Sequence, residues 1–538
     1  MATDNPRLWR FPGGIHPPGH KESAEREVAI APLPATVVLP LQQHIGDPAE
    51  PVVEVGQRVL AGELVAKCNE YLGVPVHSSV SGTVVAIEER PVAHPSGLRA
   101  PCIVIAADGT DEWVEPRPLT DYASVETTQL RMHIRKAGVV GLGGAGFPSA
   151  VKLNPSGRPV ETLILNGAEC EPYITCDDRL MRDEPEAIIR GLLVMRHALD
   201  ARRCIIAVED NKPTALTALK AARARLAAEW PAAVDIGIVA VPTRYPAGGE
   251  KQLVYTLTGQ EVPSGGLPLH IGVICHNVGT AAAVHRAVNE GYPLTERLVT
   301  VTGSAIEEPR VWRVRLGTPI GELIKSQVAA NQAIGEVLVG GPMMGYRLYH
   351  HEAPLVKTIN CLLVPTATEM APPPEPMPCI RCGACVDACP ARLLPQQLYW
   401  HARDKNLDKA QDYNLFDCIE CGCCAYVCPS NLPLVHYYRF AKTEIAAQER
   451  DRRKADIARE RHEFRQQRLE REKAERAARQ AKKKQAVASD KANGGGDSDK
   501  QAAIAAAVER ARQKKAANAA PADDRPASGG DGDTGQES

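Results

Sequence analysis

Two hydrophobic patterns divide most of the 538-residue chain. Between residues 31 and 107, apolar positions alternate with polar residues and glycines, which is typical of short β-strands joined by turns. Between residues 124 and 297, short apolar runs alternate with longer helical segments, which predicts a mostly parallel α/β sheet. The strands predicted there cover residues 162–166, 204–208, 236–241 and 271–275, and the helices include residues 184–199 and 213–230.

The first pattern follows an N-terminal extension, residues 1–30, and resembles the small barrel-sandwich of biotinyl and lipoyl carrier domains. Its turns carry glycines, but no lysine stands at an obvious hairpin tip, so we expect a structural module without an attached cofactor. After the α/β region, residues 298–365 contain two strand signals, LVTVTGS and GEVLVGG, around a helix near residues 320–327. The proline-rich segment APPPEPMP then leads into a cysteine-rich region, so that residues 366–440 form a separate module.

Composition and charge narrow the classes of function. The formal net charge of −2 gives no overall field that would attract nucleic acid or a membrane surface, so we expect no nucleic-acid partner. No run of about 18 apolar residues is present, so we expect no membrane span. The first fourteen residues lack the apolar core of a secretory signal, and we expect no export.

Residues 441–538 are predicted to be a basic helix followed by a disordered tail. Residues 442–484 hold sixteen Lys and Arg against nine Asp and Glu, without an apolar stripe. This pattern favours a solvated, partly frayed helix, and contact with anionic lipid is the alternative. From residue 489 the sequence is rich in Gly, Ala, Asp and Lys, for which we expect disorder.

Eight of the sixteen cysteines follow one spacing twice, C-x2-C-x2-C-x3-C-P. This is the bacterial ferredoxin pattern for two [4Fe–4S] clusters, in which the fourth cysteine of each run ligates the other cluster. We therefore assign one cluster to Cys379, Cys382, Cys385 and Cys428. We assign the second cluster to Cys418, Cys421, Cys424 and Cys389.

Other interpretations of these cysteines fit less well. Zinc sites usually stop at four ligands, and disulfide frameworks belong to small secreted domains. Cys423 breaks the spacing, and we expect it to be a small packed residue. The seven cysteines upstream of the motif are scattered, as expected of buried apolar residues in a reducing compartment.

A second group of candidates begins with the glycine-rich loop GLGGAGFPSAVK, residues 141–152. Glycines let the backbone approach a bulky anion and direct N–H groups at it. A helix starting near Pro148 would add its positive end, and Lys152 could neutralise a phosphate. The loop matches neither G-x-G-x-x-G nor a Walker A pattern, so the pattern alone identifies no dinucleotide or P-loop site.

Three further segments follow predicted strands: NGAECEPY at 166–173, YPAGGEKQL at 245–253 and HNVGT at 276–280. With the glycine loop, their order resembles the FMN- and NADH-binding subunit of respiratory complex I and of NAD-linked hydrogenases. The patterns of that family are GRGGAGFPTGxKW, NADESEPG, YxxGEETAL and NNVET. The resemblance implies FMN as a cofactor and NADH as a substrate, bound by Gly141, Gly143, Gly144, Gly146, Lys152, Asn166, Glu169, Glu171, Glu250, Asn277 and Thr280. It also implies that Glu169 and Glu171 face the isoalloxazine and nicotinamide end.

This chain departs from the family at four positions. Leu142 replaces an arginine, Ala168 an aspartate, and Gly249 and Gly279 each replace a glutamate. The acidic groups that are missing line the nucleotide side of the binding site in that family. The sequence therefore supports flavin binding more strongly than NADH binding. A domain that keeps this fold without its flavin is an open alternative.

Nearly the whole chain resembles the C subunits of the bacterial Rnf/Rsx electron-transport complex. The segments FPGGIHPP (11–18) and CIECGCCAYVCPSNLPLVHYYR (418–439) look like signatures of that family. The resemblance implies a multidomain α/β protein with small β modules: a barrel-sandwich domain, a flavoprotein-like domain, a β-grasp (SLBB-like) domain at 298–365, a two-cluster ferredoxin domain and a charged tail.

The implied function is that of a peripheral subunit on the cytoplasmic side of the inner membrane, held by integral and peripheral partner subunits. It would pass electrons between NADH, through FMN, and the [4Fe–4S] clusters, with ferredoxin or another carrier downstream and transport of sodium or protons coupled to the flow. The subunit would be catalytic only within the complex. Hydride transfer needs no general acid or base, and we nominate no catalytic residue.

Two rival functions remain open at this stage. The chain could be a cluster-bearing relay or scaffold without flavin, with NADH oxidised elsewhere. It could also belong to a system that keeps a redox-sensing iron–sulfur regulator reduced. Flavin absorbance separates the first rival from our interpretation, whereas the second differs only in the downstream partner.

Overall fold

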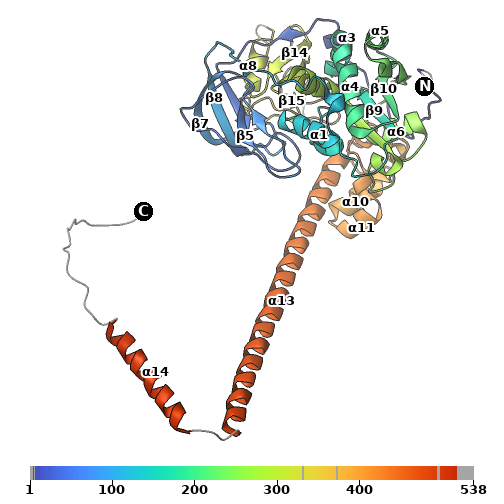
Figure 1. The fold of residues 1–538 in the computed structure, drawn as a ribbon. Coiled ribbons are helices and arrows are strands. Elements are labelled where there is room, and N and C mark those ends of the chain that lie inside the picture. Colours follow the sequence, from blue (N-terminus) through green and yellow to red (C-terminus); the bar gives the residue numbers. More distant parts are fainter. Residues whose placement is uncertain (1–3, 5, 330–331, 371–373, 493–496, 518–538) are drawn as a thin grey trace, which may run out of the picture. The chain divides into compact units, whose positions relative to one another are not determined.

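The computed structural model describes residue 4 and residues 6–329, 332–370, 374–492 and 497–517 (Figure 1). The chain divides into two compact units, one ending at Ile445 and the other beginning at Ala446. Short 3-10 or π turns occur at η1 (Glu22–Ala24), η2 (Tyr122–Ser124), η3 (Pro231–Asp235), η4 (Pro268–Ile271), η5 (Arg286–Glu290) and η6 (Leu415–Asp417).

The N-terminal module consists of two antiparallel sheets. One has the order β2 (Thr36–Pro40), β8 (Arg99–Ala107), β7 (Gly82–Pro91) and β4 (Arg58–Val59), and the other has β3 (Glu50–Pro51), β5 (Leu64–Lys67) and β6 (Val76–His77). Val37 and Leu39 of β2 and Ile103 and Ile105 of β8 are fully buried, as expected where alternate side chains of a strand enter a core. The predicted barrel-sandwich is confirmed.

The α/β region contains a four-stranded sheet whose strands are all parallel. Its order is β11 (Ile236–Val241), β10 (Arg203–Glu209), β9 (Thr162–Gly167) and β12 (Val273–Asn277). Leu163 and Leu165 of β9 pack on one face of the sheet, in the core that includes the buried residues of α4. Ile164 packs on the opposite face with the apolar residues of α6. The helices of this region are α1 (Thr127–Lys136), α2 (Ser149–Lys152), α3 (Cys176–Asp183), α4 (Pro185–Leu199), α5 (Pro213–Leu226), α6 (Glu250–Thr258) and α7 (Val278–His285).

The predicted mostly parallel sheet is confirmed, and two boundaries differ from the sequence prediction. The helix predicted at 213–230 ends at Leu226, because the chain turns toward Pro231 and the residue before a proline disfavours helix. The strand predicted at 271–275 begins at Val273. Gly272, at a left-handed φ of 71°, separates the strand from the preceding turn.

A second, mixed sheet follows in the chain. It has the order β1 (Ala29–Ile30), β14 (Arg310–Arg315), β13 (Glu296–Thr302), β17 (Cys361–Leu363), β15 (Leu338–Val339) and β16 (Tyr346–Arg347), with α8 at Ile320–Lys325. Strand β1 comes from the predicted N-terminal extension and pairs in parallel with β14. The assignment of this sheet to a β-grasp domain stays a prediction.

The cysteine-rich module consists of short helices around a small core. They are α9 (Ala384–Asp387), α10 (Pro395–Arg403), α11 (Leu407–Asp412), α12 (Cys423–Tyr426) and the first turns of α13 (Leu434–Ala492). Leu398, Leu415 and Tyr438 are almost fully buried at its centre, together with two of the motif cysteines, Cys389 and Cys424.

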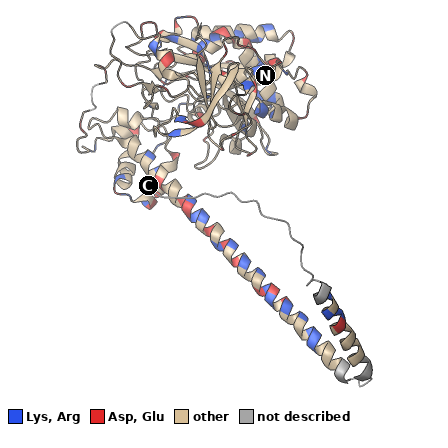
Figure 2. Ribbon diagram, turned by 90° about the vertical axis from the view of Figure 1, so that its left-hand side faces the viewer, with Lys and Arg blue, Asp and Glu red and all other residues tan. Residues whose placement is uncertain are grey.

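The second unit contains the rest of α13 and helix α14 (Asp497–Ala517). Basic and acidic residues are distributed along α13 (Figure 2), and its side chains from 448 to 489 are exposed, apart from the half-buried Asp456. The expectation of disorder from residue 489 is wrong for 497–517, because the alanine-rich sequence there has a high helix propensity. Residues 518–538 lie outside the described residues.

Candidate flavin and iron–sulfur sites

The predicted flavin residues gather at the carboxyl edge of the parallel sheet, where the strand order reverses. The order runs outward from β9 through β10 to β11, while β12 lies on the other side of β9. Asn166 and Asn277, the polar residues at the ends of β9 and β12, are direct partners in the register. In open α/β sheets this reversal creates the crevice that receives ligands.

The glycine loop lies over this edge. The backbone N–H of Leu142 donates to the buried Thr280 hydroxyl at 2.9 Å, and a Cβ on Gly143 would stand 3.1 Å from Cβ of Asn277. Gly144 and Gly146 have left-handed φ angles of 110° and 63°. Apart from Gly144 and its two chain neighbours, no described residue has an atom within 4 Å of the place of a Cβ on Gly144, so the backbone there is open to a close approach. This open backbone fits the cradle that a flavin phosphate requires.

The cation and amide predicted for the site have partners within it. Lys152, at the end of the single turn α2, forms an ion pair with Glu250 at 2.6 Å, and Glu250 begins α6. The Asn166 side chain donates to the carbonyl of Gly248 at 2.8 Å and accepts from the N–H of Ala168. Lys152, Asn166 and Glu250 therefore lie together with the glycine loop and the β12 end.

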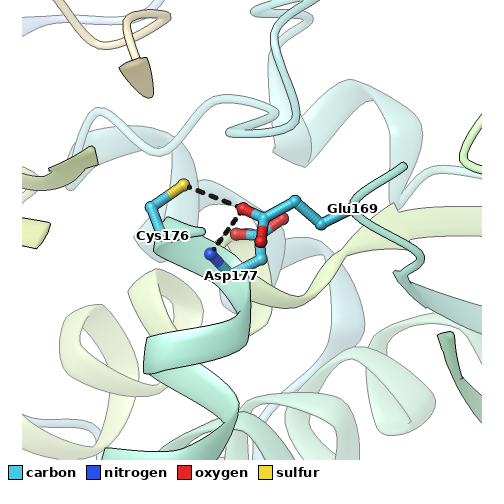
Figure 3. A group of neighbouring side chains, drawn as sticks. All are labelled: Glu169, Cys176 and Asp177. Atoms are coloured by element: carbon cyan, nitrogen blue, oxygen red, sulfur yellow. Dashed lines mark hydrogen bonds between the residues drawn. The ribbon is translucent and has the colours of Figure 1, made fainter. Parts of the chain in front are cut away.

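Glu169 lies in a buried acidic group with Cys176 and Asp177 (Figure 3). Its carboxylate accepts the backbone N–H groups of Asp177 at 2.8 Å and Asp178 at 3.3 Å, and the Cys176 thiol at 3.4 Å. Burial and the neighbouring Asp177 raise the pKa of Glu169 to about 7. Asp177 in turn accepts from Asn277 at 2.6 Å, which links this group to the end of β12.

Glu171 points to a different neighbour, the loop that follows β15. Its carboxylate accepts the backbone N–H of Met343 at 2.7 Å and of Met344 at 3.1 Å. Lys21 fixes the backbone on both sides of it by donating to the carbonyls of Glu169, Glu171 and Ile174. The role of Glu169 and Glu171 at the nicotinamide end stays a prediction.

The two cysteine motifs are a structural repeat with a constant offset of 39 residues. Arg381 and Glu420 have φ angles of 59° and 57°, and Gly383 and Gly422 have 86° and 80°. Each glycine is followed by a four-residue helix, α9 or α12. The same backbone path therefore presents each set of three thiols.

Several thiols lie beside members of the crossed sets expected from the spacing, while the assignment of the cluster ligands stays a prediction. Burial raises the pKa of Cys385, and the neighbouring thiols that add to the rise are Cys382 and Cys428. Burial likewise raises the pKa of Cys418 to about 11, with Cys421 and Cys389 as its neighbouring thiols.

One cavity in the module is lined by all four thiols assigned to the second cluster, Cys389, Cys418, Cys421 and Cys424. A closed set of four thiolates is the donor set that a [4Fe–4S] cluster requires. The buried Tyr438 borders the same cavity, and its hydroxyl donates to the carbonyl of Pro395 at 2.7 Å.

The second thiol set is packed against the α/β region. The Tyr245 hydroxyl donates to the carbonyl of Cys421 at 2.7 Å, and both residues lie in an apolar cluster with Ile15, Ala388 and Cys423. Cys423 is fully buried there, as expected of a packed residue.

The N-terminal segment completes this contact. The N–H of Gly14 donates to the carbonyl of Ala388 at 2.9 Å, and Ile15 pairs with Tyr245. Gly13, at a φ of 60°, leaves no room for a Cβ beside the Cys389 carbonyl. Gly13 of FPGGIHPP is thus required by its close approach to a predicted cluster ligand, and Gly14 by its close approach to Arg244 and Tyr245.

Sequence reasoning missed these bridging residues. Tyr245 and Met343 are far from the cysteines in sequence, and no spacing rule relates them. Lys21 and the buried Arg297, which donates to the carbonyl of Leu142 at 3.0 Å, were missed for the same reason. The available signals were the glycine pair in the N-terminal segment and the tyrosine that begins YPAGGEKQL.

Three family models match the chain. They are the Nuo51 FMN-binding domain at residues 134–286, the RnfC barrel sandwich hybrid domain at residues 9–110 and the 4Fe-4S dicluster domain at residues 378–432. Within the described residues, no helix is both long and apolar enough to cross a membrane.

Among solved structures, an NAD+-reducing [NiFe]-hydrogenase in the H2-reduced state is 18% identical, with a TM-score of 0.42 and coverage of 62% of this chain and 63% of that chain.

Three relatives, each named as the C subunit of an ion-translocating oxidoreductase complex, are similar over almost the whole chain. The protein of Erwinia tasmaniensis is 49% identical over 96% of this chain, which spans 62% of its length. Those of Pectobacterium carotovorum and Pectobacterium atrosepticum are each 48% identical, over 96% and 95% of this chain and 67% and 72% of their own lengths. The chain belongs to the family of ion-translocating oxidoreductase complex C subunits.

Proposed function

We propose that this chain is the electron-transfer subunit of a membrane-bound ion-translocating complex, in which it exchanges electrons between NADH and one-electron carriers. The observation that carries the proposal is the contact of the second thiol set with the flavin-domain residue Tyr245. A two-electron site and a one-electron site that share a packed boundary are what such an exchange requires.

The residues at the sheet edge suit FMN. The open backbone at Gly144 would hold the phosphate, with Lys152 close by, while Asn166, Asn277 and Thr280 fix the surrounding loops. Bound FMN supplies the ability to accept a hydride, which carries two electrons, and to release those electrons one at a time, which a cluster cannot do. The protein's part is to position the flavin and exclude water.

The two crossed sets of thiols would hold two [4Fe–4S] clusters, each able to carry one electron. Cluster 1 is defined by Cys379, Cys382, Cys385 and Cys428, and cluster 2 by Cys389, Cys418, Cys421 and Cys424. Because only the second set contacts Tyr245, cluster 2 is the neighbour of the flavin domain in this proposal.

The partners in this proposal are integral and peripheral subunits of the same complex, with ferredoxin or another electron carrier downstream. The chain would lie at the cytoplasmic side of the inner membrane as a peripheral subunit. The name shared by the relatives, which places each of them in an ion-translocating oxidoreductase complex, supports this assignment.

The test is an anaerobic preparation of the full chain, assayed for iron, sulfide and flavin. We expect about eight irons and one flavin per chain, with loss of the flavin's visible absorbance on addition of NADH. Two clusters without flavin would support a relay instead and refute NADH oxidation by this chain. Zinc or free thiols in place of iron would refute the electron-transfer function altogether.

A further inference from the structure

The repeat of the cysteine motifs gives each cluster an equivalent outer face. At an offset of 39 residues, Ile380, Cys382 and Gly383 correspond to Ile419, Cys421 and Gly422. The backbone angles of the two segments agree closely, so that the faces have the same local shape. Differences between them therefore arise from what the rest of the chain places against each face.

The face of cluster 2 is covered. Cys421 is only 7% exposed, and a Cβ on Gly422 would stand 3.0 Å from the carbonyl oxygen of Met343. Tyr245 bonds to the Cys421 carbonyl, and the partly buried Ile419 packs into the same apolar cluster. The covering surface is mainly apolar and comes from three parts of the chain, namely the N-terminal segment with Ile15, the flavin-assigned region with Tyr245 and the loop after β15 with Met343.

The face of cluster 1 is uncovered by the described residues. Ile380 is 68% exposed, Met377 is 55% exposed and Cys382 is exposed as well. Apart from Gly383 and its two chain neighbours, no described residue has an atom within 4 Å of the place of a Cβ on Gly383. An apolar, ligand-bearing face open to solvent suits contact with another protein.

The charges of the two faces also differ. Glu420 is neutralised by Arg439 at 3.0 Å and Lys442 at 2.8 Å. Its counterpart Arg381 is exposed, and none of the ion pairs among the described residues includes it. The uncovered face therefore has a cation at its rim, which favours an acidic partner surface.

We propose that the surface formed by Met377, Ile380, Arg381 and Cys382 is the docking site for an iron–sulfur electron-carrier protein with an acidic rim. It would occupy the position at cluster 1 that Tyr245, Ile15 and the Met343 loop occupy at cluster 2. Reduced cluster 1 would give one electron to the partner's cluster, so that cluster 1 is oxidised and the partner's cluster is reduced by one electron each. The transfer needs no further reactant. This inference depends on the proposed function for its redox step, but not for the contact itself.

The contact is tested by photocrosslinking in the intact complex. p-Benzoylphenylalanine is placed at Ile380 of the full chain, membranes of the producing bacterium are irradiated, and products are identified by mass spectrometry. The matched control carries the same group at Trp400, an exposed position on α10 of the same module. We expect a crosslink from position 380 to an iron–sulfur protein, and none from position 400 to that protein.

A crosslink to a protein without an iron–sulfur cluster, to a second copy of this chain or to nothing would overturn the docking proposal. The substitution Arg381→Glu supplies a kinetic test, since an altered rim charge acts mainly on association. We expect electron transfer from the chain to the crosslinked carrier to slow by about tenfold at low salt. NADH reduction of the chain's own clusters, followed by their paramagnetic resonance signal, should stay unchanged.

These two readouts separate the two proposals. If NADH fails to reduce the clusters of the unmodified chain, the proposed function fails whatever the crosslinks show. If NADH reduces the clusters and Arg381→Glu leaves transfer to the carrier unchanged, the docking surface is wrong and the proposed function stands.

Discussion

Lys357 is a buried cation without a carboxylate partner among the described residues, and its replacement should change how stability depends on pH. The side chain is 1% exposed and donates to the carbonyls of Gly138 at 2.8 Å and Pro75 at 3.1 Å. Burial lowers the pKa of Lys357 from 10.5 to about 7. The amine therefore connects the barrel-sandwich, the α/β region and the second sheet at a point where its protonated form is disfavoured.

The magnitude follows from the two pKa values. The unfolded chain holds the proton up to pH 10.5, whereas the folded chain releases it near pH 7, so the unfolded state binds more protons in this window. The free energy of unfolding therefore rises with pH between 7 and 10.5. Each pH unit contributes up to about 1.4 kcal/mol, which amounts to about 2 kcal/mol between pH 7 and pH 9.

The substitution Lys357→Met should remove this rise. At pH 7 the gain from removing the disfavoured amine is offset by leaving the two carbonyls without their donor, at about 1–3 kcal/mol each. The informative quantity is therefore the change with pH, and not the stability at one pH.

The assay is urea denaturation of variant and unmodified chain at pH 7 and pH 9 under anaerobic conditions, followed by tryptophan fluorescence. Lys325→Met, at an exposed position in the same sheet region, is the control and should keep the full pH dependence. An unchanged slope in Lys357→Met would refute the reasoning, because it would mean that the folded protein keeps the amine charged.

Three further predictions test other parts of the structure. Cys421→Ala should reduce iron from about eight to about four per chain, whereas Cys423→Ala should keep about eight; equal iron contents would contradict the ligand assignment. Gly13→Ala should lower the amount of cluster 2 measured by iron analysis, because a Cβ there overlaps the Cys389 carbonyl. Gly19→Ala is the matched control, since its Cβ would make only an ordinary contact with Lys21. Burial lowers the pKa of His77 from 6.5 to about 3, so the free energy of unfolding should fall as the pH drops below 6.5. In urea denaturation between pH 6.5 and 5, this fall should be smaller by about 2 kcal/mol in His77→Gln than in the unmodified chain. An identical fall in both proteins would count against the prediction.

Local sequence determined the parts of the fold that local physics controls. The strands β9, β10 and β11 are continuous apolar runs bounded by polar residues and turns, and their predicted limits agree with the structure within one residue. The spacing of the cysteines likewise depends on cluster geometry, and the thiols beside Cys385 and Cys418 belong to the crossed sets that it predicts, although the ligand assignment itself stays a prediction. Family membership follows from the same motifs.

Contacts between distant segments could not be predicted in this way. Strand β1 has two residues, and its place beside β14 depends on a partner almost 300 positions later. The acceptor role of Glu171 depends on the N–H groups of Met343 and Met344, which no pattern near Glu171 indicates. Propensity alone was sufficient for α14, but the glycine-rich sequence before it led to the wrong expectation of disorder.

The two clusters differ because long-range contacts cover the outer face of cluster 2, whereas the described residues leave the outer face of cluster 1 uncovered. Both motifs have the same spacing and backbone, yet Tyr245 and Met343 lie against the second motif, and Gly13 lies against Cys389, the ligand that the first motif is predicted to give to cluster 2. Glu171 anchors the Met343 loop that touches Gly422, so one residue predicted for the flavin side also supports the packing around cluster 2. The two ends of the repeated module therefore differ: one end is joined to the flavin domain, and the other is open to a partner. This difference between the two ends is a property of the tertiary structure, because neither cysteine motif encodes it alone.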